Sequence, residues 1–304
     1  MSFEVTILGS GGALPTLNRN STAQFVTCCN RHILIDCGEG TQLQMRKFGV
    51  HFQRLDIILI SHLHGDHFFG LVGLLSTMRL LGRDGKLTII CPKGLPAIIQ
   101  QQLEIGFQKL DFDIHYIELT GKEQQMVYED KSIEIHCFPL KHKVPTSGFL
   151  IAEKPKERKM KKDQLDHPLL KIEYIHRLKK GEDVTTEDGT VLLSKDFTDE
   201  PPVPLSYVYC SDTAYFEKVV ENIKNATTLY HEATFLEMHK DLAKATQHST
   251  AKQAATIAKM ANVGTLYMGH LSARYGSTNE FVAEAQEIFE NAHYVEDGMK
   301  FSVK

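Results

Sequence analysis

Four side chains that can bind metal ions fall within six positions of this chain, in the segment His62-Leu63-His64-Gly65-Asp66-His67. The preceding residues 55–61 are apolar and β-branched, which is typical of a strand covered on both faces. Residues 68–81 carry apolar side chains at helical spacing, and Gly82 is a suitable helix stop. The segment is therefore predicted to form a loop between a buried strand and a helix, where ligands are held rigidly.

The spacing inside this loop predicts two metal ions rather than one. Alternate residues of an extended segment share a face, so His62 and His64 can bind the same ion. Asp66 and His67 lie where the chain turns into the helix, and they suit a second ion. The alternative interpretation is a polar loop with ordinary hydrogen-bonded histidines.

Three more candidate ligands, His142, Asp212 and His270, follow predicted strands at 132–139, 205–210 and 265–268. The seven groups together suffice for two ions if Asp212 bridges them. One ion would take His62, His64, His142 and Asp212, and the other would take Asp66, His67, His270 and Asp212. Nitrogen and oxygen ligands without thiolate fit Zn²⁺, with Mn²⁺ or Fe as alternatives. A pair of such ions activates water for attack on an anionic phosphodiester.

Two β-rich stretches, each followed by helices, must position these side chains. Strands are expected at residues 3–8, 23–28, 31–36, 55–61, 87–91, 114–119, 125–128, 132–139, 205–210, 228–231 and 265–268. Helices are expected at 38–48, 68–81, 95–108, 251–261 and 279–291, and Thr250 with Gln253 fits a capping box at the start of the fourth. This order predicts an α/β (α+β) fold, in which a two-half β-sandwich has helices outside.

The composition is that of an ordinary globular protein, with 304 residues, 42% hydrophobic and 24% charged. No run approaches the roughly 18 consecutive apolar residues of a membrane span, and the N-terminus lacks the basic region of a signal peptide. The 6 cysteines show no CxxC spacing and interrupt apolar runs, which favours buried, reduced thiols. We therefore expect a cytoplasmic location and no membrane partner.

Residues 153–204 interrupt the globular pattern, because they are polar, charged and poor in regular periodicity. The exception is a predicted hairpin at 183–193 around Asp188-Gly189. Between Lys154 and Lys180, ten Lys and Arg residues stand against four Asp and Glu, within a chain of net charge −4. One interpretation is a flexible inserted arm that contacts an RNA backbone; the other is a solvated insertion without a ligand.

Several motifs resemble those of the metallo-β-lactamase superfamily and, within it, of the ribonuclease Z family of tRNA 3′-processing endonucleases. The resemblance covers nearly the whole chain. The family's N-terminal loop is similar to Leu8-Gly9-Ser10-Gly11-Gly12 with Pro15 and Arg19-Asn20. The family's first shared motif is similar to Leu34-Ile35-Asp36-Cys37-Gly38-Glu39-Gly40-Thr41-Gln42. Signatures of the ribonuclease Z branch are similar to His231-Glu232-Ala233-Thr234, His248-Ser249-Thr250 and His270-Leu271-Ser272-Ala273-Arg274-Tyr275.

This resemblance implies a four-layer αββα sandwich, in which residues 1–304 form a single domain with 153–204 as an RNA-contacting arm. It also implies a homodimer and a precursor tRNA substrate. The expected reaction is zinc-dependent removal of the 3′ trailer. It leaves a 3′-OH on the tRNA and a 5′-phosphate on the trailer.

The resemblance also implies roles for individual residues. Asp66 would be both metal ligand and proton acceptor, while His248 would protonate the leaving 3′ oxygen and Glu232 would orient His248. A structural ion pair is the alternative for Glu232 and His248. Asp36 would orient a ligand histidine. The candidate RNA contacts are Arg19, Asn20 and Arg274.

The chain departs from the family pattern in three places. The arm lacks the Gly-Pro element that usually precedes Leu-Lys-Gly-type residues, although Leu178 to Gly181 keep the second part. Ser211 stands where Gly is usual before the ligand aspartate, and residues 16–18 lack the Lys often found in the N-terminal loop. Phosphate contacts by the arm and by that loop are therefore weaker predictions than the metal ligands.

Three other functions remain open. The same centre could serve a metal-dependent phosphodiesterase that acts on small nucleotides or other RNA ends. A di-iron redox protein of this fold would want a carboxylate at the position of His64 and an attached flavin domain, and the sequence has neither. A non-catalytic RNA-binding relative would lack some ligand, whereas every ligand position here is filled.

Overall fold

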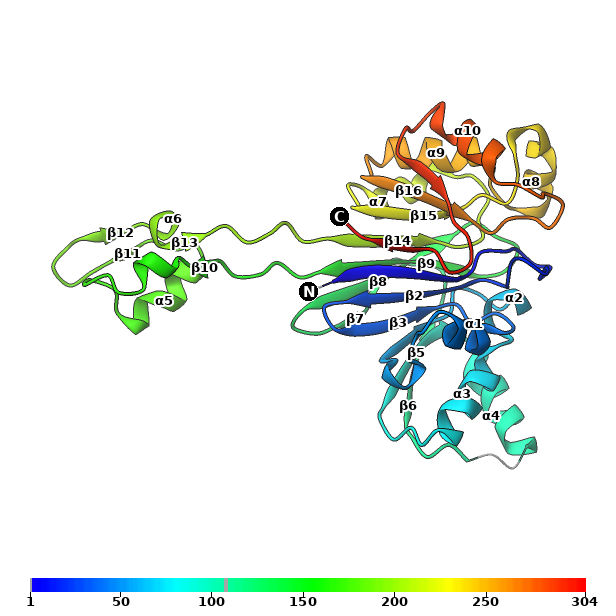
Figure 1. Cartoon of the computed structure of the whole chain (residues 1–304), viewed down its shortest axis with the longest axis horizontal. Coiled ribbons are helices and arrows are strands. Elements are labelled where there is room, and N and C mark those ends of the chain that lie inside the picture. Colours follow the sequence, from blue (N-terminus) through cyan, green and yellow to red (C-terminus); the bar gives the residue numbers. More distant parts are fainter. Residues whose placement is uncertain (1, 107–108) are drawn as a thin grey trace. The chain divides into compact units, whose positions relative to one another are not determined.

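Two seven-stranded sheets dominate the computed structural model, which describes residues 2–106 and 109–304 (Figure 1). The first sheet has the order β18-β1-β2-β3-β4-β5-β6. Its strands are β1 Phe3–Gly9, β2 Ala23–Cys28, β3 Arg31–Ile35, β4 Ile57–Leu59, β5 Leu87–Pro92, β6 Ile114–Leu119 and β18 Lys300–Ser302. The neighbouring strands β3, β4, β5 and β6 are parallel. Their continuous apolar character agrees with a sheet buried on both faces.

The second sheet has the order β17-β16-β15-β14-β9-β8-β7. Its strands are β7 Gln125–Glu129, β8 Ile133–Leu140, β9 Thr146–Glu153, β14 Ser206–Cys210, β15 Thr228–Glu232, β16 Thr265–Gly269 and β17 Ala292–Tyr294. Strands β14 to β17 are parallel to one another, so their carboxyl ends lie along one edge of the sheet.

Three hydrophobic clusters hold these layers together. One lies between the sheets and contains side chains of both, such as Ile7 and Ile33 from the first and Phe149 and Tyr209 from the second. The outer face of the first sheet packs against α1 Thr41–Lys47, α3 Leu71–Leu80 and α4 Leu95–Ile105. The outer face of the second packs against α7 Val220–Ile223, α9 Ala251–Met260 and α10 Asn279–Gln286 (Figure 1). The predicted αββα sandwich is confirmed.

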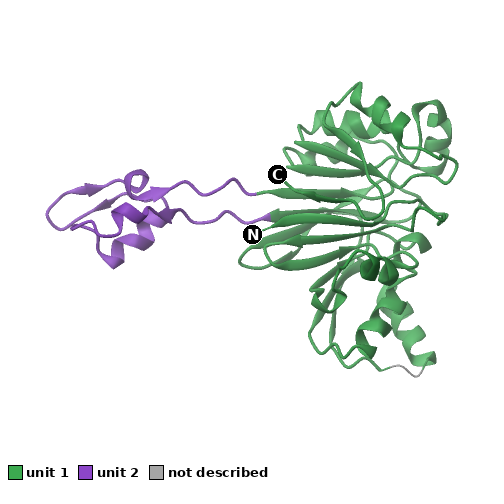
Figure 2. Ribbon diagram, viewed as in Figure 1, with its two compact units in different colours: residues 1–152, 205–304 green, residues 153–204 purple. Residues whose placement is uncertain are grey.

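The chain divides into two compact units, residues 1–152 with 205–304, and residues 153–204 (Figure 2). The second unit contains β10 Lys159–Met160, α5 Ile172–Lys179, β11 Val184–Thr185, β12 Val191–Leu192, α6 Ser194–Phe197 and β13 Thr198–Asp199. It has its own small core of Tyr174, Leu178, Val184, Leu192 and Phe197. The sequence pattern predicts only the β11–β12 hairpin here, and the structure adds the helices α5 and α6 and a second strand pair, β10–β13.

Other elements differ from the expected bounds in explicable ways. The helix expected over 68–81 begins as a separate short turn, α2 Gly65–Phe68, before α3. The helix expected over 95–108 is α4, and its last two expected residues lie outside the described part of the chain. The helix expected over 279–291 ends at Gln286 as α10, and α8 Lys240–Thr246 was not expected. The predicted capping box of Thr250 and Gln253 opens α9 and is confirmed.

Strand β9 Thr146–Glu153 is absent from the sequence prediction, because its apolar run begins only after Gly148. A side chain at this position would meet the Phe138 ring at 2.4 Å and the Tyr209 carbonyl oxygen at 3.0 Å. The close packing of the neighbouring strands therefore requires glycine here. Strands β17 and β18 are also absent from the sequence prediction, because each has only 3 residues and lacks the continuous apolar run that reveals β4. No helix in the described part of the chain is both long and apolar enough to cross a membrane.

Candidate metal centre

The seven predicted metal ligands lie on segments that follow the carboxyl ends of strands. The loop of residues 60–64 follows β4, and α2 then carries Asp66 and His67. Strand β14 ends two residues before Asp212, and β16 ends immediately before His270. His142 follows the end of β8 by two residues. The carboxyl ends of strands from both sheets thus bring together residues that are up to more than two hundred positions apart in the sequence.

His62, His64, His142 and Asp212 form the first group, whose candidate ligand atoms all lie within 4.8 Å of one another. Nδ1 of His64 lies 3.0 Å from Nε2 of His62 and 3.2 Å from Nε2 of His142. Asp212 contributes Oδ2, which lies 3.7 Å from Nε2 of His62.

Asp66, His67, Asp212 and His270 form the second group, within the same limit of 4.8 Å. Oδ2 of Asp66 lies 3.4 Å from Nε2 of His67 and 3.4 Å from Nε2 of His270. Oδ1 of Asp212 lies 3.5 Å from Nε2 of His67 and 3.2 Å from Nε2 of His270. The two oxygens of Asp212 therefore face different groups, which is the arrangement that a bridging carboxylate needs.

The donor set fits divalent cations. Nε2 of His67 and Oδ1 of Asp212 are buried in the described structure without a hydrogen-bond partner, although buried polar atoms normally have one. Burial alone would lower the pKa of His67, but Asp212, Asp36 and Asp66 outweigh it and hold this pKa well above its usual value. These carboxylates thus create a buried pocket that favours positive charge.

Burial, supported by repulsion from His67, lowers the pKa of His62 well below its usual value. Burial also lowers the pKa values of His64 and His142. These three side chains are therefore neutral imidazoles at neutral pH, which is the form that binds metal ions.

Asp36 fixes the orientation of His67. Its Oδ2 lies 2.7 Å from Nδ1 of His67 and also accepts the hydroxyl hydrogens of Tyr209, at 2.7 Å, and Ser61, at 2.9 Å. Its Oδ1 accepts the backbone N–H of Ser61 at 2.7 Å. With Nδ1 bonded to Asp36, the Nε2 lone pair of His67 points toward the second group.

Three other ligand histidines have comparable partners on Nδ1. His62 lies 3.0 Å from the Ser61 hydroxyl, and His142 donates to the Gln247 carbonyl oxygen at 2.9 Å. His270 lies 2.8 Å from the Thr234 hydroxyl. The sequence did not predict Gln247, because it contributes a backbone carbonyl. Thr234 did carry a signal, since it stands two positions after Glu232 in a segment that resembles a family signature.

Glu232 and His248 form a pair beside this centre. Glu232 is fully buried, and its Oε1 lies 2.9 Å from Nδ1 of His248 and accepts the backbone N–H groups of Ser249 and Thr213. Burial alone would lower the pKa of His248, but Glu232 and Asp212 outweigh it and raise this pKa to about 9. The His248 ring stacks on that of His270, with 5.3 Å between centroids. A protonated imidazole thus borders the second group.

A pocket of about 350 Å³ opens next to this pair. His248, His270, Phe235 and Arg274 are among its lining residues. The Arg274 guanidinium lies 5.9 Å from the centre of the Phe235 ring. The pocket thus offers an apolar ring, a guanidinium and the candidate proton donor on one surface.

The other two predicted RNA contacts have partners within the protein. Arg19 donates to the Ser10 hydroxyl at 2.8 Å and to the Val295 carbonyl oxygen at 3.0 Å. The Asn20 amide donates to Asp297 at 2.9 Å. RNA contact by these two residues stays a prediction.

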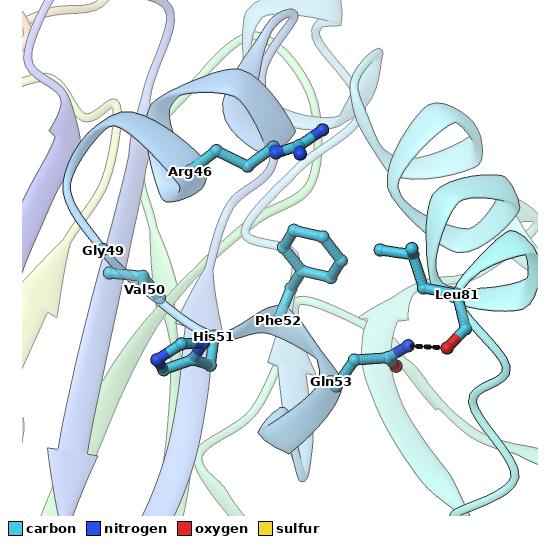
Figure 3. Close-up of a pocket in the computed structure, with 7 residues that line it drawn as sticks. All are labelled: Arg46, Gly49, Val50, His51, Phe52, Gln53 and Leu81. Atoms are coloured by element: carbon cyan, nitrogen blue, oxygen red, sulfur yellow. Dashed lines mark hydrogen bonds between the residues drawn. The ribbon is translucent and has the colours of Figure 1, made fainter.

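Another pocket, of about 320 Å³, is lined by Arg46 of α1, by residues 49–53 and by Leu81 (Figure 3). Its lining includes Arg46, His51 and Phe52, and Gln53 closes one side by donating to the Leu81 carbonyl oxygen at 2.8 Å. None of its lining residues belongs to the metal-ligand groups found in the described structure. It therefore contributes nothing to the chemistry of the centre.

Comparison with known proteins extends the similarity over the whole chain. A ribonuclease Z of Parabacteroides distasonis is 42% identical over 301 residues, which cover 99% of each chain. The chain belongs to the ribonuclease Z family. The crystal structure of human tRNase Z, short form, matches with a TM-score of 0.71 and 26% identity, and it covers 99% of each chain. The metallo-β-lactamase fold protein YhfI of Bacillus subtilis shares the fold, with a TM-score of 0.69, 19% identity and coverage of 99% of this chain and 100% of YhfI.

Residues 3–161 also match the model of a second family, described as anti-Pycsar protein Apyc1, and so this half of the chain belongs to that family as well. That match includes the ligand loop and His142. It ends before Asp212, Glu232, His248 and His270. The ribonuclease Z relatives include all of these positions, because they match nearly the entire chain.

Proposed function

We propose that this member of the ribonuclease Z family is a metal-dependent endoribonuclease that removes the 3′ trailer of precursor tRNA. The products are a tRNA with a 3′-OH and a trailer with a 5′-phosphate. One observation carries the proposal: His270 of the ligand set and His248, the partner of Glu232, line the same pocket. Hydrolysis of RNA needs both, since it requires an activated water and a proton for the leaving oxygen.

Two divalent cations, with Zn²⁺ as our preferred identity, would be held by the two groups, and Asp212 would bridge them. When bound, such ions polarise phosphate oxygens and lower the pKa of water. The five imidazoles and two carboxylates of the groups include no thiolate, which suits Zn²⁺ and also permits Mn²⁺ or Fe.

Asp66 would orient the attacking water by accepting a hydrogen bond from it. Burial alone would raise the pKa of Asp66, but His67 and His270 outweigh it and hold this pKa far below its usual range. The carboxylate is therefore ionised at neutral pH and can accept a hydrogen bond from water. Its Oδ2 lies beside Nε2 of His67 and Nε2 of His270, so a water bound between these ligands would be within hydrogen-bond distance of Oδ2.

His248 would give its proton to the departing 3′ oxygen, which is a poor leaving group as an alkoxide. Glu232 keeps the imidazole protonated and fixes its orientation through the bond to Nδ1. Proton donation of this kind contributes about 10²–10⁴-fold to a rate. The buried hydrogen bonds that Glu232 accepts from Ser249 and Thr213 hold the donor in place.

RNA would be bound by Arg274 at the pocket and by exposed lysines of unit 153–204. A guanidinium pairs well with phosphate, and the Phe235 ring beside it can stack on a base. In unit 153–204, Lys159, Lys162 and Lys180 are exposed. Exposed cations of this kind bind a phosphate backbone by releasing its counterions.

A second copy of this chain would cover an apolar surface formed by α1, α3 and the turn between α2 and α3. On this surface Leu43, Phe69, Leu80 and Leu81 have exposed fractions of 66%, 68%, 77% and 57%. Exposed apolar side chains on neighbouring helices such as α1 and α3 favour a protein interface. We expect a dimer by light scattering, and Leu80→Glu should convert it to a monomer; a monomeric wild-type protein would contradict this assignment.

The cytoplasm would be the cellular location. All 6 cysteines are buried, and Cys37, Cys91, Cys137 and Cys210 form no disulfide in the described structure. Buried cysteines outside disulfides suit a reducing compartment.

The proposal is tested by comparing cleavage of a synthetic precursor tRNA with hydrolysis of bis-p-nitrophenyl phosphate, both in the presence of Zn²⁺. We expect kcat/KM for the precursor tRNA to be higher by at least about 10³-fold, because only RNA engages Arg274 and the exposed lysines. Hydrolysis of the small ester without cleavage of the tRNA would instead indicate a phosphodiesterase that acts on small nucleotides.

A further inference from the structure

Asp297, in the turn before the last strand, accepts five hydrogen bonds from segments far away in the sequence. Its Oδ1 accepts the backbone N–H of Ser10 at 2.9 Å and the Ser10 hydroxyl at 2.7 Å. Its Oδ2 accepts the backbone N–H of Asn20 at 2.9 Å, the Asn20 amide at 2.9 Å and the Gln44 amide at 3.0 Å. One carboxylate thus fixes both ends of the loop of residues 10–20.

The same loop holds the backbone of the metal ligand His270. The Ser10 carbonyl oxygen accepts the N–H of His270 at 3.0 Å and that of Leu271 at 3.1 Å. In return, the N–H of Gly12 donates to the Leu271 carbonyl oxygen at 3.0 Å. Ser10 therefore contacts Asp297 through its N–H and hydroxyl and His270 through its carbonyl.

His270 needs this support because its backbone is in the left-handed region, with φ of 66°. A non-glycine residue in this region is strained, so its conformation persists only when its surroundings hold it. The loop also packs directly on the imidazole, since a side chain at Gly12 would lie 3.3 Å from Cε1 of His270. A small shift of the loop would therefore release both the backbone and the ring of His270.

We infer that Asp297 is a positioning residue for the second metal group, because it clamps the 10–20 loop that holds His270 in its ligating conformation. Arg19 belongs to the same clamp, since its guanidinium bonds the Ser10 hydroxyl and the Val295 carbonyl oxygen. This inference rests on the metal groups of the proposed function. It is tested by metal binding alone, so it can fail without any bearing on RNA cleavage.

Asp297→Asn is the most direct test. The amide keeps the size of the side chain, but its NH₂ must face either the two donors of Ser10 or the three donors from Asn20 and Gln44. Zn²⁺ binding to the metal-free variant is measured by titration in a zinc-buffered solution and by mass spectrometry. We expect one of the two ions to bind about 10–100-fold more weakly and the other to bind with little change.

Asp130→Asn is the matched control. Asp130 accepts the backbone N–H groups of Ser132 and Ile133 at 2.7 and 3.0 Å and Nε of Arg31 at 2.6 Å, beside the β7–β8 hairpin. It should lower the melting temperature of the metal-free protein by a comparable amount and leave both Zn²⁺ affinities unchanged. The control separates a general loss of stability from a local effect on His270.

If the Asp297→Asn variant folds and binds both Zn²⁺ ions with wild-type affinity, the inference is overturned, whatever the melting temperature of the variant. If that variant does not fold, Ser10→Ala decides, because it removes only the hydroxyl that bonds Asp297 and Arg19. We expect a smaller loss of affinity for the same ion. Unchanged binding of both ions in that variant would equally overturn the inference.

Discussion

The two compact units of this chain handle charge in opposite ways. In residues 1–152 with 205–304, Asp36, Asp212 and Glu232 are buried and surrounded by hydrogen-bond donors or histidines. In residues 153–204, the core is a small apolar cluster and the lysines at 159, 162 and 180 are exposed to solvent. Chemistry needs fixed groups in a dry site, whereas binding of a phosphate backbone needs accessible cations. Changes in the first unit should therefore alter turnover, and changes in the second should alter substrate affinity.

The largest effect is expected from Asp66→Ala. This change removes a ligand of the second group and the carboxylate that accepts a hydrogen bond from the attacking water. Turnover of both precursor tRNA and bis-p-nitrophenyl phosphate should fall below detection, because the effect does not depend on the size of the substrate. Steady-state rates on the two substrates check this expectation, and retention of more than about one-hundredth of either rate would contradict the role.

His248→Ala tests whether the unit of residues 1–152 and 205–304 supplies the proton for the leaving group. We expect kcat for precursor tRNA to fall about 10²–10⁴-fold, because the 3′ oxygen then leaves without a proton. Bis-p-nitrophenyl phosphate should be affected much less, since p-nitrophenolate is a good leaving group that needs no proton.

Zn²⁺ content, measured by mass spectrometry, is the control for His248→Ala and should remain at the wild-type value. Equal losses on both substrates, or loss of the metal, would show that His248 is not the proton donor. That result would instead favour a structural ion pair with Glu232.

Thr234→Val should produce an intermediate effect. The Thr234 hydroxyl lies between Nδ1 of His270, at 2.8 Å, and Oε2 of Glu232, at 2.8 Å, so it can accept from the former and donate to the latter. Its removal should lower metal affinity or activity about 10–100-fold. Thr234→Ser retains the hydroxyl and should stay near the wild-type values; a serine variant as weak as the valine variant would contradict the hydrogen-bond explanation.

The smallest effect on chemistry is expected from changes in residues 153–204. The triple variant Lys159→Ala, Lys162→Ala and Lys180→Ala should raise KM for precursor tRNA about tenfold at low salt, because three cations near the RNA backbone are lost. Its kcat and its activity on bis-p-nitrophenyl phosphate should stay within about twofold of wild type, since no buried group is altered.

A control for that variant removes the same charge from exposed lysines of the other unit, at Lys86, Lys109 and Lys122. This control should leave KM for precursor tRNA nearly unchanged. If both triple variants raise KM equally, residues 153–204 make no special contribution and the loss reflects net charge alone.

Local spacing predicted the parts of the site that are continuous in sequence. The ligand loop is an example, because the alternation of His62 and His64 and the following helical turn are visible in the sequence itself. His142 and His270 were predicted only through their positions after expected strands and through the resemblance. Which nitrogen of each ring faces the metal groups depends on partners such as Gln247, and this could not be read from the chain.

The remaining features depend on contacts between segments that are distant in sequence. Asp297 gave no signal, because its role comes from the meeting of the last strand with the loop near Ser10. Helix α5 does have a signal in the sequence, since Tyr174 and Leu178 stand four positions apart in a charged segment and share one helix face. The high charge of residues 153–204 masked this short apolar stripe.

The termini of the cleavage products test the central proposal most directly. A precursor tRNA is cleaved with Zn²⁺ present, and the ends at the cut are identified by mass spectrometry. Hydrolysis by a water oriented by Asp66, with a proton from His248, predicts a 3′-OH on the tRNA and a 5′-phosphate on the trailer. A 2′,3′-cyclic phosphate on the tRNA and a 5′-OH on the trailer would contradict it, because the attacking group would then be the RNA's own 2′-hydroxyl.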